Sequence, residues 1–418
     1  MPQSQSIYNA FEPADFDAWK KQVIKEVKGE EAFAVLYKTT AEGVPVHPYY
    51  TLDDIEGKDL TPISTTKQGW TIQERVAINS TVNAEQITQD LLNKGTEQVV
   101  FVVNDELVIN KITPSVSSTL LAKGFIPSLP KIYVDALMVL AEKAEWNSIS
   151  NTIDKSNTTY LVDAAPYHNA GANTCTEIAL TLAHANEYLN LGVQQLTLNL
   201  AVGSDYFFEI AKLRAVRKLY ALLAQQYGAN ETVTLQCETA LNNTTIYDYN
   251  NNILRTSTEA MAAVIGGCDA LYVYPYDVLF KQPHDFSARI ARNIQLVLKK
   301  EAYLDKVTDA AHGSYYIESL SDEIATKSWD LFKEIEAKGG WIAGIQSGFL
   351  QQTVAKQAQA TQLLVDEGKQ VILGVNKYPN ANEKMKGEIE PVQLSDNKLF
   401  PLHCFAAKAE QERINNEV

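Results

Sequence analysis

The sequence predicts an α/β protein built on a (β/α)8 TIM-type barrel that is degenerate in its early strands and carries extended N- and C-terminal arms. Short segments rich in β-branched and aromatic residues alternate with longer amphipathic segments along most of the chain. This alternation is typical of parallel strands joined by crossover helices. The 418 residues leave room for a barrel of ~250 residues and two extensions.

Seven segments are expected to form barrel strands, and helical segments or turns separate them along the chain. They are residues 70–72, 98–103, 131–134, 159–163, 196–200, 233–237 and 271–274. Residues 107–109 form either an eighth strand or one arm of a hairpin. The pattern is least regular over residues 80–160, so the number of strands in that region is left open.

Helices are expected where a capping signal precedes an apolar stripe and glycine follows it. Thr256 and Glu259 have the spacing of a capping box, and Gly266 with Gly267 marks the helix end. Similar signals place caps at Thr174, Ser287 and Ser321. Further helices are expected over residues 14–27, 207–228 and 349–366.

The expected organisation is an N-terminal arm at 1–66, a barrel with following helices at 67–375 and a C-terminal arm at 376–418. The arms contain aromatic residues of the kind that protein interfaces enrich. These are Phe11, Trp19, Tyr49, Tyr50, Phe400 and Phe405. The rings pack either on the chain's own barrel or on a partner subunit.

Composition excludes several classes of partner. The formal charge is −15, which argues against nucleic acid or an anionic membrane as the main partner. The four cysteines form no Cys-x-x-Cys pair, so no zinc or redox motif is expected. The few unpaired cysteines suit a reducing cytoplasm, and the polar N-terminus and the lack of a long apolar run predict no signal peptide and no membrane span.

Candidate site residues are expected just past the strands, because barrel chemistry takes place at the carboxyl ends of the strands. The candidates for this barrel mouth are Arg75, Tyr167, His168, Glu238, Tyr272 and Tyr274. Each also has a structural interpretation. Arg75 and Glu238 can form an ion pair, His168 can be a hydrogen-bonded loop histidine, and the tyrosines can be core rings.

Four motifs over fewer than seventy residues closely resemble methylmalonyl-CoA mutases. They are Asn-Ile-Leu-Arg-Thr-Ser-Thr-Glu-Ala-Met (252–261), Gly-Gly (266–267), Ser-Ala-Arg-Ile-Ala-Arg-Asn (287–293) and Gly-Ser-Tyr-Tyr-Ile-Glu (313–318). Shorter matches include Trp-Thr-Ile (70–72), Ala-Gly-Ala-Asn (170–173) and Phe-Phe-Glu-Ile-Ala-Lys-Leu-Arg (207–214). The resemblance spans nearly the whole chain.

The resemblance implies that catalytic positions have changed in this chain. Catalytic mutases carry a substrate-facing tyrosine where this chain has Arg75, and a histidine where it has Pro166, two places from His168. Their last barrel strand carries a histidine and an asparagine where this chain has Tyr272 and Tyr274. The family's cobalamin motif, Asp-x-His-x-x-Gly, belongs to a separate C-terminal domain, and this sequence contains no Asp-x-His.

The resemblance therefore implies the small, non-catalytic subunit of a heterodimeric methylmalonyl-CoA mutase. Its large subunit is expected to bind adenosylcobalamin and to interconvert methylmalonyl-CoA and succinyl-CoA. This chain is expected to bind no cofactor or metal and to have no catalytic residue. The alternatives are an acyl-CoA mutase barrel that works with a separate cobalamin-binding chain, and a stand-alone barrel that binds an unrelated small molecule.

Overall fold

A computed structural model describes residues 15–63, 65, 68–78, 84–103, 118–122, 132–133, 135–149, 153, 160–392, 394 and 397–417. The chain divides into two compact units, Met1–Glu56 and Gly57–Val418. The first unit ends about ten residues before the expected arm boundary at 66. The expected strand at 107–109 and the ring of Phe11 lie outside the described residues.

The first unit is small and held together by aromatic contacts. It contains α1 (Phe16–Glu26), α2 (Glu30–Ala34), the antiparallel strands β1 (Lys38–Thr39) and β2 (Pro45–Val46), and η2 (Leu52–Ile55). The predicted helix over 14–27 is present as α1, and Asp15 caps it by accepting a hydrogen bond from the Ala18 amide at 2.8 Å. The Trp19 ring stacks on Tyr49, with centroids 5.0 Å apart, and meets Phe33 edge-on.

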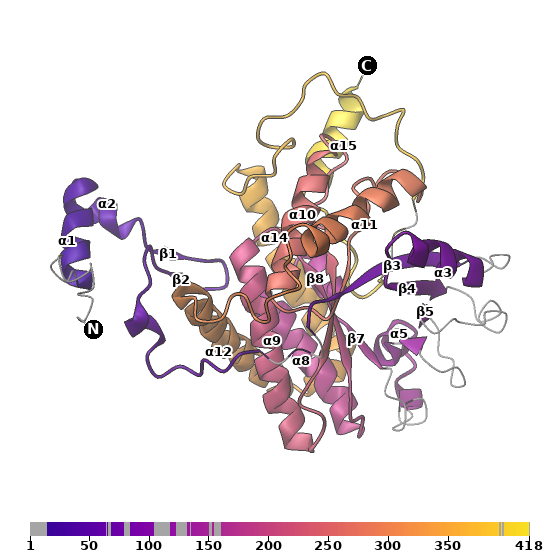
Figure 1. Cartoon of the computed structure of the whole chain (residues 1–418), viewed down its shortest axis with the longest axis horizontal. Coiled ribbons are helices and arrows are strands. Elements are labelled where there is room, and N and C mark those ends of the chain that lie inside the picture. The colour runs from indigo at the N-terminus through magenta and orange to yellow at the C-terminus, as the bar shows by residue number, and fades with distance from the viewer. Residues whose placement is uncertain are drawn as a thin grey trace, which may run out of the picture. The chain divides into compact units, whose positions relative to one another are not determined.

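The second unit contains an all-parallel, eight-stranded sheet (Figure 1). Its strands are β3 (Thr71–Ile78), β4 (Gln98–Val103), β5 (Ser118–Ala122), β6 (Ile132–Tyr133), β7 (Leu161–Asp163), β8 (Thr197–Val202), β9 (Thr234–Thr239) and β10 (Ala270–Tyr272). The spatial order is β6-β5-β4-β3-β10-β9-β8-β7. The first and last barrel strands are therefore neighbours, which is the topology of a (β/α) barrel and confirms the predicted fold class.

The two ends of this sheet are β6 and β7, and within the described part of the chain no strand ladder joins them. The side chain of Asp135 forms a connection at this place instead. Asp135 caps α5 (Ala136–Glu142), which follows β6, by accepting from the Met138 amide at 3.1 Å. Its other oxygen accepts from the Asp163 amide of β7 at 2.8 Å. The region 80–160, where the sequence pattern is least regular, thus contains β6, one of the two edge strands that are not paired with each other.

Helices alternate with the strands and also form an outer layer. The sheet helices are α3 (Ala84–Asn93), α5, η3 (Trp146–Ser148), α7 (Ala165–Asn169), α8 (Thr174–Asn190), α9 (Tyr206–Tyr227), α10 (Asn251–Ile265) and α11 (Asp285–Lys300). They are followed by α12 (Tyr315–Ala337), α13 (Gly340–Gln346), α14 (Phe349–Asp366) and α15 (Ala407–Asn416). Because α12 packs on both α8 and α9, these two helices lie between the sheet and an outer helix (Figure 1).

Most predicted helices are present, but several predicted caps are wrong. Thr256 lies inside α10, which begins at Asn251, and its hydroxyl donates to the Asn252 carbonyl at 2.9 Å. Ser321 lies inside α12 and donates to the Ile317 carbonyl at 2.7 Å. Asn173 rather than Thr174 caps α8. Ser287 lies inside α11 rather than at its cap. Serine and threonine can bond the carbonyl four residues earlier in a helix, so the capping pattern does not fix a helix start.

The C-terminal residues do not form a free arm. Phe400 and Phe405 are 2% and 8% exposed, and the Phe400 ring meets Tyr167 edge-on at 4.8 Å. The segment also includes α15. Of the two alternatives for these rings, packing within the chain itself is therefore the one that the structure shows.

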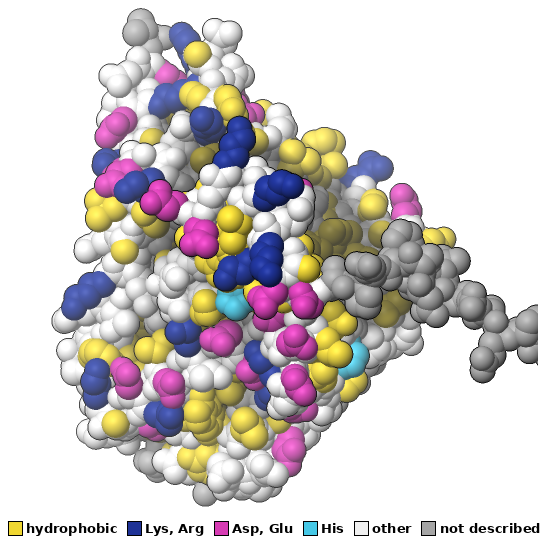
Figure 2. Space-filling model, turned by 90° about the vertical axis from the view of Figure 1, so that its left-hand side faces the viewer, with side chains coloured by type: hydrophobic (Ala, Val, Ile, Leu, Met, Phe, Trp, Pro, Cys, Tyr) yellow, Lys and Arg dark blue, Asp and Glu magenta, His cyan; other side chains and the backbone are white. Residues whose placement is uncertain are grey.

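On the face drawn in Figure 2, Lys and Arg side chains lie among Asp and Glu side chains. No extended surface of one sign appears on that face. Separately, no helix in the described ranges is both long and apolar enough to cross a lipid bilayer.

Candidate functional site in the barrel

Polar side chains of alternate strand residues meet inside the barrel. The strand register places Tyr272 opposite both Gln73 and Glu238, and Asp163 opposite Asn199. Outward residues on the same strands, such as Leu198 and Leu271, are fully buried under the helices. Alternation along each strand therefore gives an apolar outer face and a polar interior.

The centre of this interior is an ion pair between Arg75 of β3 and Glu238 of β9. Arg75 Nη1 lies 2.5 Å from Glu238 Oε2, and Arg75 Nη2 donates to Asn199 Oδ1 at 3.3 Å. The guanidinium carbon also lies 4.8 Å from the centroid of the Tyr272 ring, a cation–π contact. Burial alone would lower the pKa of Arg75, but Glu238 and the neighbouring tyrosines raise it above its usual value. Arg75 is therefore a fixed cation.

Two carboxylates share the amide of Asn199 beside this cation. Asn199 Nδ2 donates to Asp163 Oδ1 at 2.8 Å and to Glu238 Oε2 at 3.0 Å. Burial and the nearby Glu238 raise the pKa of Asp163 to about 7. The carboxyl group of Asp163 therefore changes its protonation near neutral pH.

Tyr274 completes the cluster from just past β10. Its hydroxyl donates to Glu238 Oε1 at 3.2 Å, and its ring meets Tyr272 edge-on at 4.8 Å. Burial raises the pKa of both tyrosines above the ordinary value, so both are neutral hydrogen-bond donors. The barrel-mouth cluster is defined here as Arg75, Asp163, Asn199, Glu238, Tyr272 and Tyr274. Because its members already bind one another, a ligand entering this space must displace existing hydrogen bonds.

His168 lies in a different cluster, behind the end of β8. Its Nδ1 is 3.0 Å from Glu177 Oε2 of α8. The fully buried ammonium of Lys212 lies 2.9 Å from the same oxygen and donates to the Ala201 carbonyl at 2.7 Å. Burial alone would raise the pKa of Glu177, but Lys212 and His168 lower it below the usual value. His168 is thus a hydrogen-bonded histidine between helices.

Tyr167 lies in a third cluster, within the helical layer. Its hydroxyl accepts from Trp341 Nε1 at 2.8 Å and lies 3.0 Å from His184 Nδ1. The His184 ring stacks on Trp341 at 4.1 Å, and its Nε2 is 3.2 Å from Asp135 Oδ1. The structure therefore brings together Arg75, Glu238, Tyr272 and Tyr274, but not Tyr167 or His168.

Two members of the barrel-mouth cluster, Asp163 and Asn199, were not singled out from the sequence. Both lie within predicted strands at positions that alternate with buried apolar residues. A polar residue at every second position of a central strand indicates a polar barrel interior, and this signal could have identified them.

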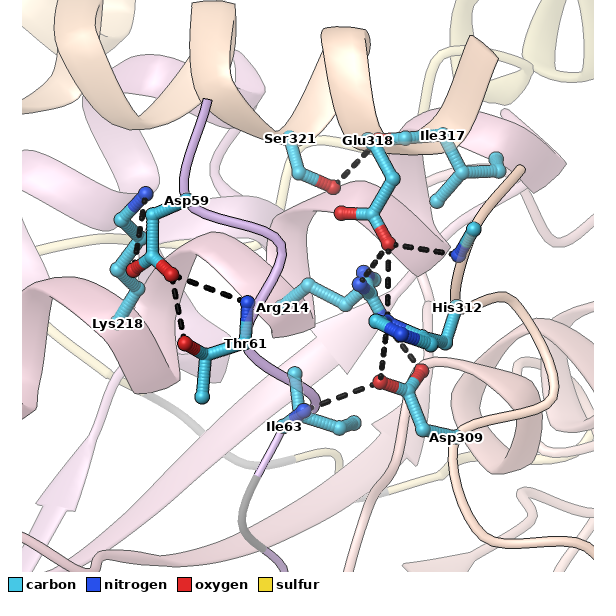
Figure 3. A network of polar contacts seen from close by, with 11 residues as sticks. Asp59, Thr61, Ile63, Arg214, Lys218, Asp309, His312, Ile317, Glu318 and Ser321 are labelled. Carbon is cyan, nitrogen blue, oxygen red and sulfur yellow. Dashed lines mark hydrogen bonds and ion pairs between the residues drawn. The ribbon is translucent and has the colours of Figure 1, made fainter. Parts of the chain in front are cut away.

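The motifs behind the family resemblance meet in structural contacts. Arg214, from motif 207–214, donates to Glu318 Oε1 of motif 313–318 at 2.8 Å and also binds Asp309 (Figure 3). Asp309 Oδ2 in turn accepts from the Ile63 amide at 3.0 Å. Arg292, from motif 287–293, pairs with Glu74 of β3. These residues hold helices and the 57–63 segment onto the barrel, so the motifs identify its scaffold.

Comparison with known proteins agrees with this scaffold. A family model described as methylmalonyl-CoA mutase matches residues 134–416, about two thirds of the chain. The chain is 28% identical to the methylmalonyl-CoA mutase small subunit of Porphyromonas gingivalis (strain ATCC BAA-308 / W83), over 91% of this chain and 72% of that protein.

It is 36% identical to the methylmalonyl-CoA mutase large subunit of the same organism, over 58% of this chain and 36% of that protein. The methylmalonyl-CoA mutase of Escherichia coli (strain K12) is 32% identical over 65% of this chain and 40% of that protein. The chain thus spans less than half the length of these two relatives. The family match across the barrel and the helices that follow it shows that this chain belongs to the methylmalonyl-CoA mutase family.

Proposed function

We propose that this chain is the small subunit of a two-subunit methylmalonyl-CoA mutase and has no catalytic activity of its own. It pairs one-to-one with a homologous large subunit, and the complex interconverts methylmalonyl-CoA and succinyl-CoA. The large subunit supplies the substrate-binding residues and adenosylcobalamin. This chain supplies a stable barrel and the contacts that hold the complex together.

The observation that carries the proposal is the ion pair inside the barrel. An acyl-CoA that enters a barrel needs open space or groups that are free to bind it. Here the guanidinium of Arg75 is bound to Glu238 and Asn199 and packed on Tyr272. Displacing it would leave a buried cation or carboxylate without its partner, which costs several kcal/mol. The same position is expected to hold the substrate-facing tyrosine in catalytic chains.

The histidines of the chain lie outside the family's cobalamin-ligand motif, Asp-x-His-x-x-Gly. In the described ranges each has a side-chain neighbour at its ring. The pairs are His168 with Glu177, His184 with Tyr167, His284 with Asp277, His312 with Glu318, His403 with Gln362 and His47 with Tyr50. None follows an aspartate at the spacing Asp-x-His. We therefore assign adenosylcobalamin, the source of the radical in this chemistry, to the large subunit.

Co-expression with a longer mutase homologue from the same cell tests the pairing. We expect the two chains to co-elute in a 1:1 complex on size-exclusion chromatography. Separate elution of two folded chains would refute the proposed partnership.

Calorimetry on this chain alone tests the proposed lack of a substrate site. We expect no saturable binding of methylmalonyl-CoA, with the purified large subunit as the positive control. A micromolar dissociation constant for this chain would support the alternative, a mutase barrel that works with a separate cobalamin-binding chain.

A further inference from the structure

The C-terminal residues 379–392, 394 and 397–417, called the C-terminal segment below, lie on the loops at the carboxyl end of the barrel. Three such loops are involved. The loop after β7 contributes Asn169, whose carbonyl accepts from the His403 amide at 2.9 Å. The loop after β9 contributes Asn242, whose carbonyl accepts from the Phe405 amide at 2.9 Å. The loop after β10 contributes Phe280, whose carbonyl accepts from the Glu390 amide at 2.8 Å.

Glutamates of the C-terminal segment bind backbone amides of the same loops. Glu410, which is 3% exposed, accepts from the Ile246 and Tyr247 amides at 2.7 and 3.2 Å. Glu383 accepts from the Asp248 amide at 2.7 Å, and Glu390 from the Gln282 amide at 3.0 Å. Loop amides have no strand or helix partner, so a carboxylate acceptor from another part of the chain fixes their conformation.

Apolar anchors accompany these hydrogen bonds. Phe400 packs on Tyr167, which follows β7. Met385 is 1% exposed and packs with Tyr247 and Phe280, from the loops after β9 and β10. Burial of such side chains removes apolar surface from water and so stabilises the attachment. The attachment therefore combines backbone, carboxylate and apolar contacts at three separate loops.

We infer that the C-terminal segment is a built-in cover for the carboxyl end of the barrel. This is the end at which (β/α) barrels bind their ligands. Because the chain's own residues occupy these loop atoms, a ligand or protein that binds the same atoms must displace the segment. This inference concerns the chain alone and does not depend on its subunit role.

Cys404 provides an internal probe of the cover. It lies between Phe405 and His403, and its sulfur is 3.7 Å from the Leu241 carbonyl. Burial raises the pKa of Cys404 to about 12, so its reactive thiolate is scarce while the segment is docked. The other three cysteines, Cys175, Cys237 and Cys268, are buried in the barrel and helices. They report whether the whole chain has unfolded.

The test measures thiol labelling with DTNB at pH 8 in the full chain, its Glu410→Ala variant and its Glu412→Ala variant. Glu410 holds the β9 loop, whereas Glu412 is exposed on the same helix and serves as the matched control. We expect one thiol of Glu410→Ala to react at least tenfold faster than in the parent, while three stay slow. Adding Cys404→Ser should abolish that fast phase. The control should label like the parent.

Hydrogen exchange on the same three proteins locates the change. We expect faster exchange in Glu410→Ala for peptides covering 240–248, with α9 and α12 unchanged. The inference is overturned if Cys404 of the parent reacts as fast as a free thiol. It is also overturned if Glu410→Ala labels like the parent, or if all four thiols react together.

Discussion

Arg75 and Glu238 show how a barrel of this family can be filled by its own side chains. They come from β3 and β9, which lie on either side of β10, and meet at 2.5 Å inside the sheet. Their side chains are 13% and 4% exposed, so the charges are mostly removed from water. A buried pair of this kind contributes little net stability when complete, but removing one partner leaves an uncompensated charge.

Glu238→Ala therefore should be strongly destabilising. We expect the free energy of unfolding in urea to fall by about 3 kcal/mol, because Arg75 stays buried without its carboxylate. Glu334→Ala, at an exposed position on α12, should change it by less than about 0.5 kcal/mol. If Glu238→Ala is as stable as the parent, the barrel interior is more hydrated than the contacts indicate.

Asp163 should make stability depend on pH. Burial and Glu238 raise the pKa of Asp163 to about 7 in the folded chain, whereas an unfolded aspartate titrates near ~4. Between these values the folded chain holds a proton that the unfolded chain has lost. Its free energy of unfolding therefore falls as the pH rises through this window.

Asp163→Asn removes this titration and keeps the acceptor for Asn199. We expect the variant to be about 1–2 kcal/mol more stable than the parent at pH 8, a value reduced for partial solvent screening, and unchanged near pH ~4. Denaturation curves at both pH values measure the difference, with the exposed Asp330→Asn as control. A gain of the same size at both pH values would contradict the assigned titration.

At the scale of elements, the sequence predicted most strands and helices because they follow ordinary periodicity and end at glycines. Residues 118–122 form β5, a strand that was not predicted, whereas the alternatives left open for 107–109 lie outside the described residues. Thr256 and Ser321 were read as helix caps, but their hydroxyls bond carbonyls within helices that begin earlier. Such local signals are ambiguous because the same hydroxyl serves a cap or a helix interior.

Part of the candidate site could also be predicted from the sequence. Arg75, Glu238, Tyr272 and Tyr274 were expected together because their strands end on one side of the sheet. Tyr167 and His168 were expected there too, but the short helix α7 carries them into contacts with α8 and α13. The direction of a turn just past a strand depends on the packing around it, which the sequence pattern does not contain.

The contact between α14 and the turn before α8 can be tested at Gly171. Its φ is +98°, and a Cβ there would lie 2.6 Å from Ala358 Cβ of α14. We expect Gly171→Ala to lower stability by about 2–4 kcal/mol, combining backbone strain and overpacking. Gly228 also has a positive φ, +62°, but a Cβ there would meet no atom within 4 Å. Gly228→Ala should therefore lower the free energy of unfolding by only about 1–2 kcal/mol.

Thermal and urea denaturation of both variants measures the loss of stability. The double variant Gly171→Ala/Ala358→Gly then separates overpacking from backbone strain. The double variant should recover the part that is due to overpacking. If it recovers nothing, α14 does not pack on this turn as described.

At the scale of the whole molecule, the residues that hold the fold together differ from those inside the barrel. The motifs shared with mutases hold helices to the sheet through Arg214, Glu318 and Arg292. The barrel interior holds Arg75, Glu238, Asn199, Asp163 and Tyr274 linked to one another by hydrogen bonds. The C-terminal rings of Phe400 and Phe405 pack inside the chain rather than facing a partner. These features favour a supporting role in which the fold is kept and substrate binding is left to a partner.

The isomerase rate of the large subunit, measured with and without this chain, tests the central proposal most directly. With adenosylcobalamin and methylmalonyl-CoA present, we expect no turnover from this chain alone and a much lower rate from the large subunit alone than from the 1:1 complex. The complex should keep its rate when this chain carries Tyr274→Phe, because that hydroxyl contacts no substrate in this account. Turnover by this chain alone, or a large subunit that is fully active without it, would contradict the proposal.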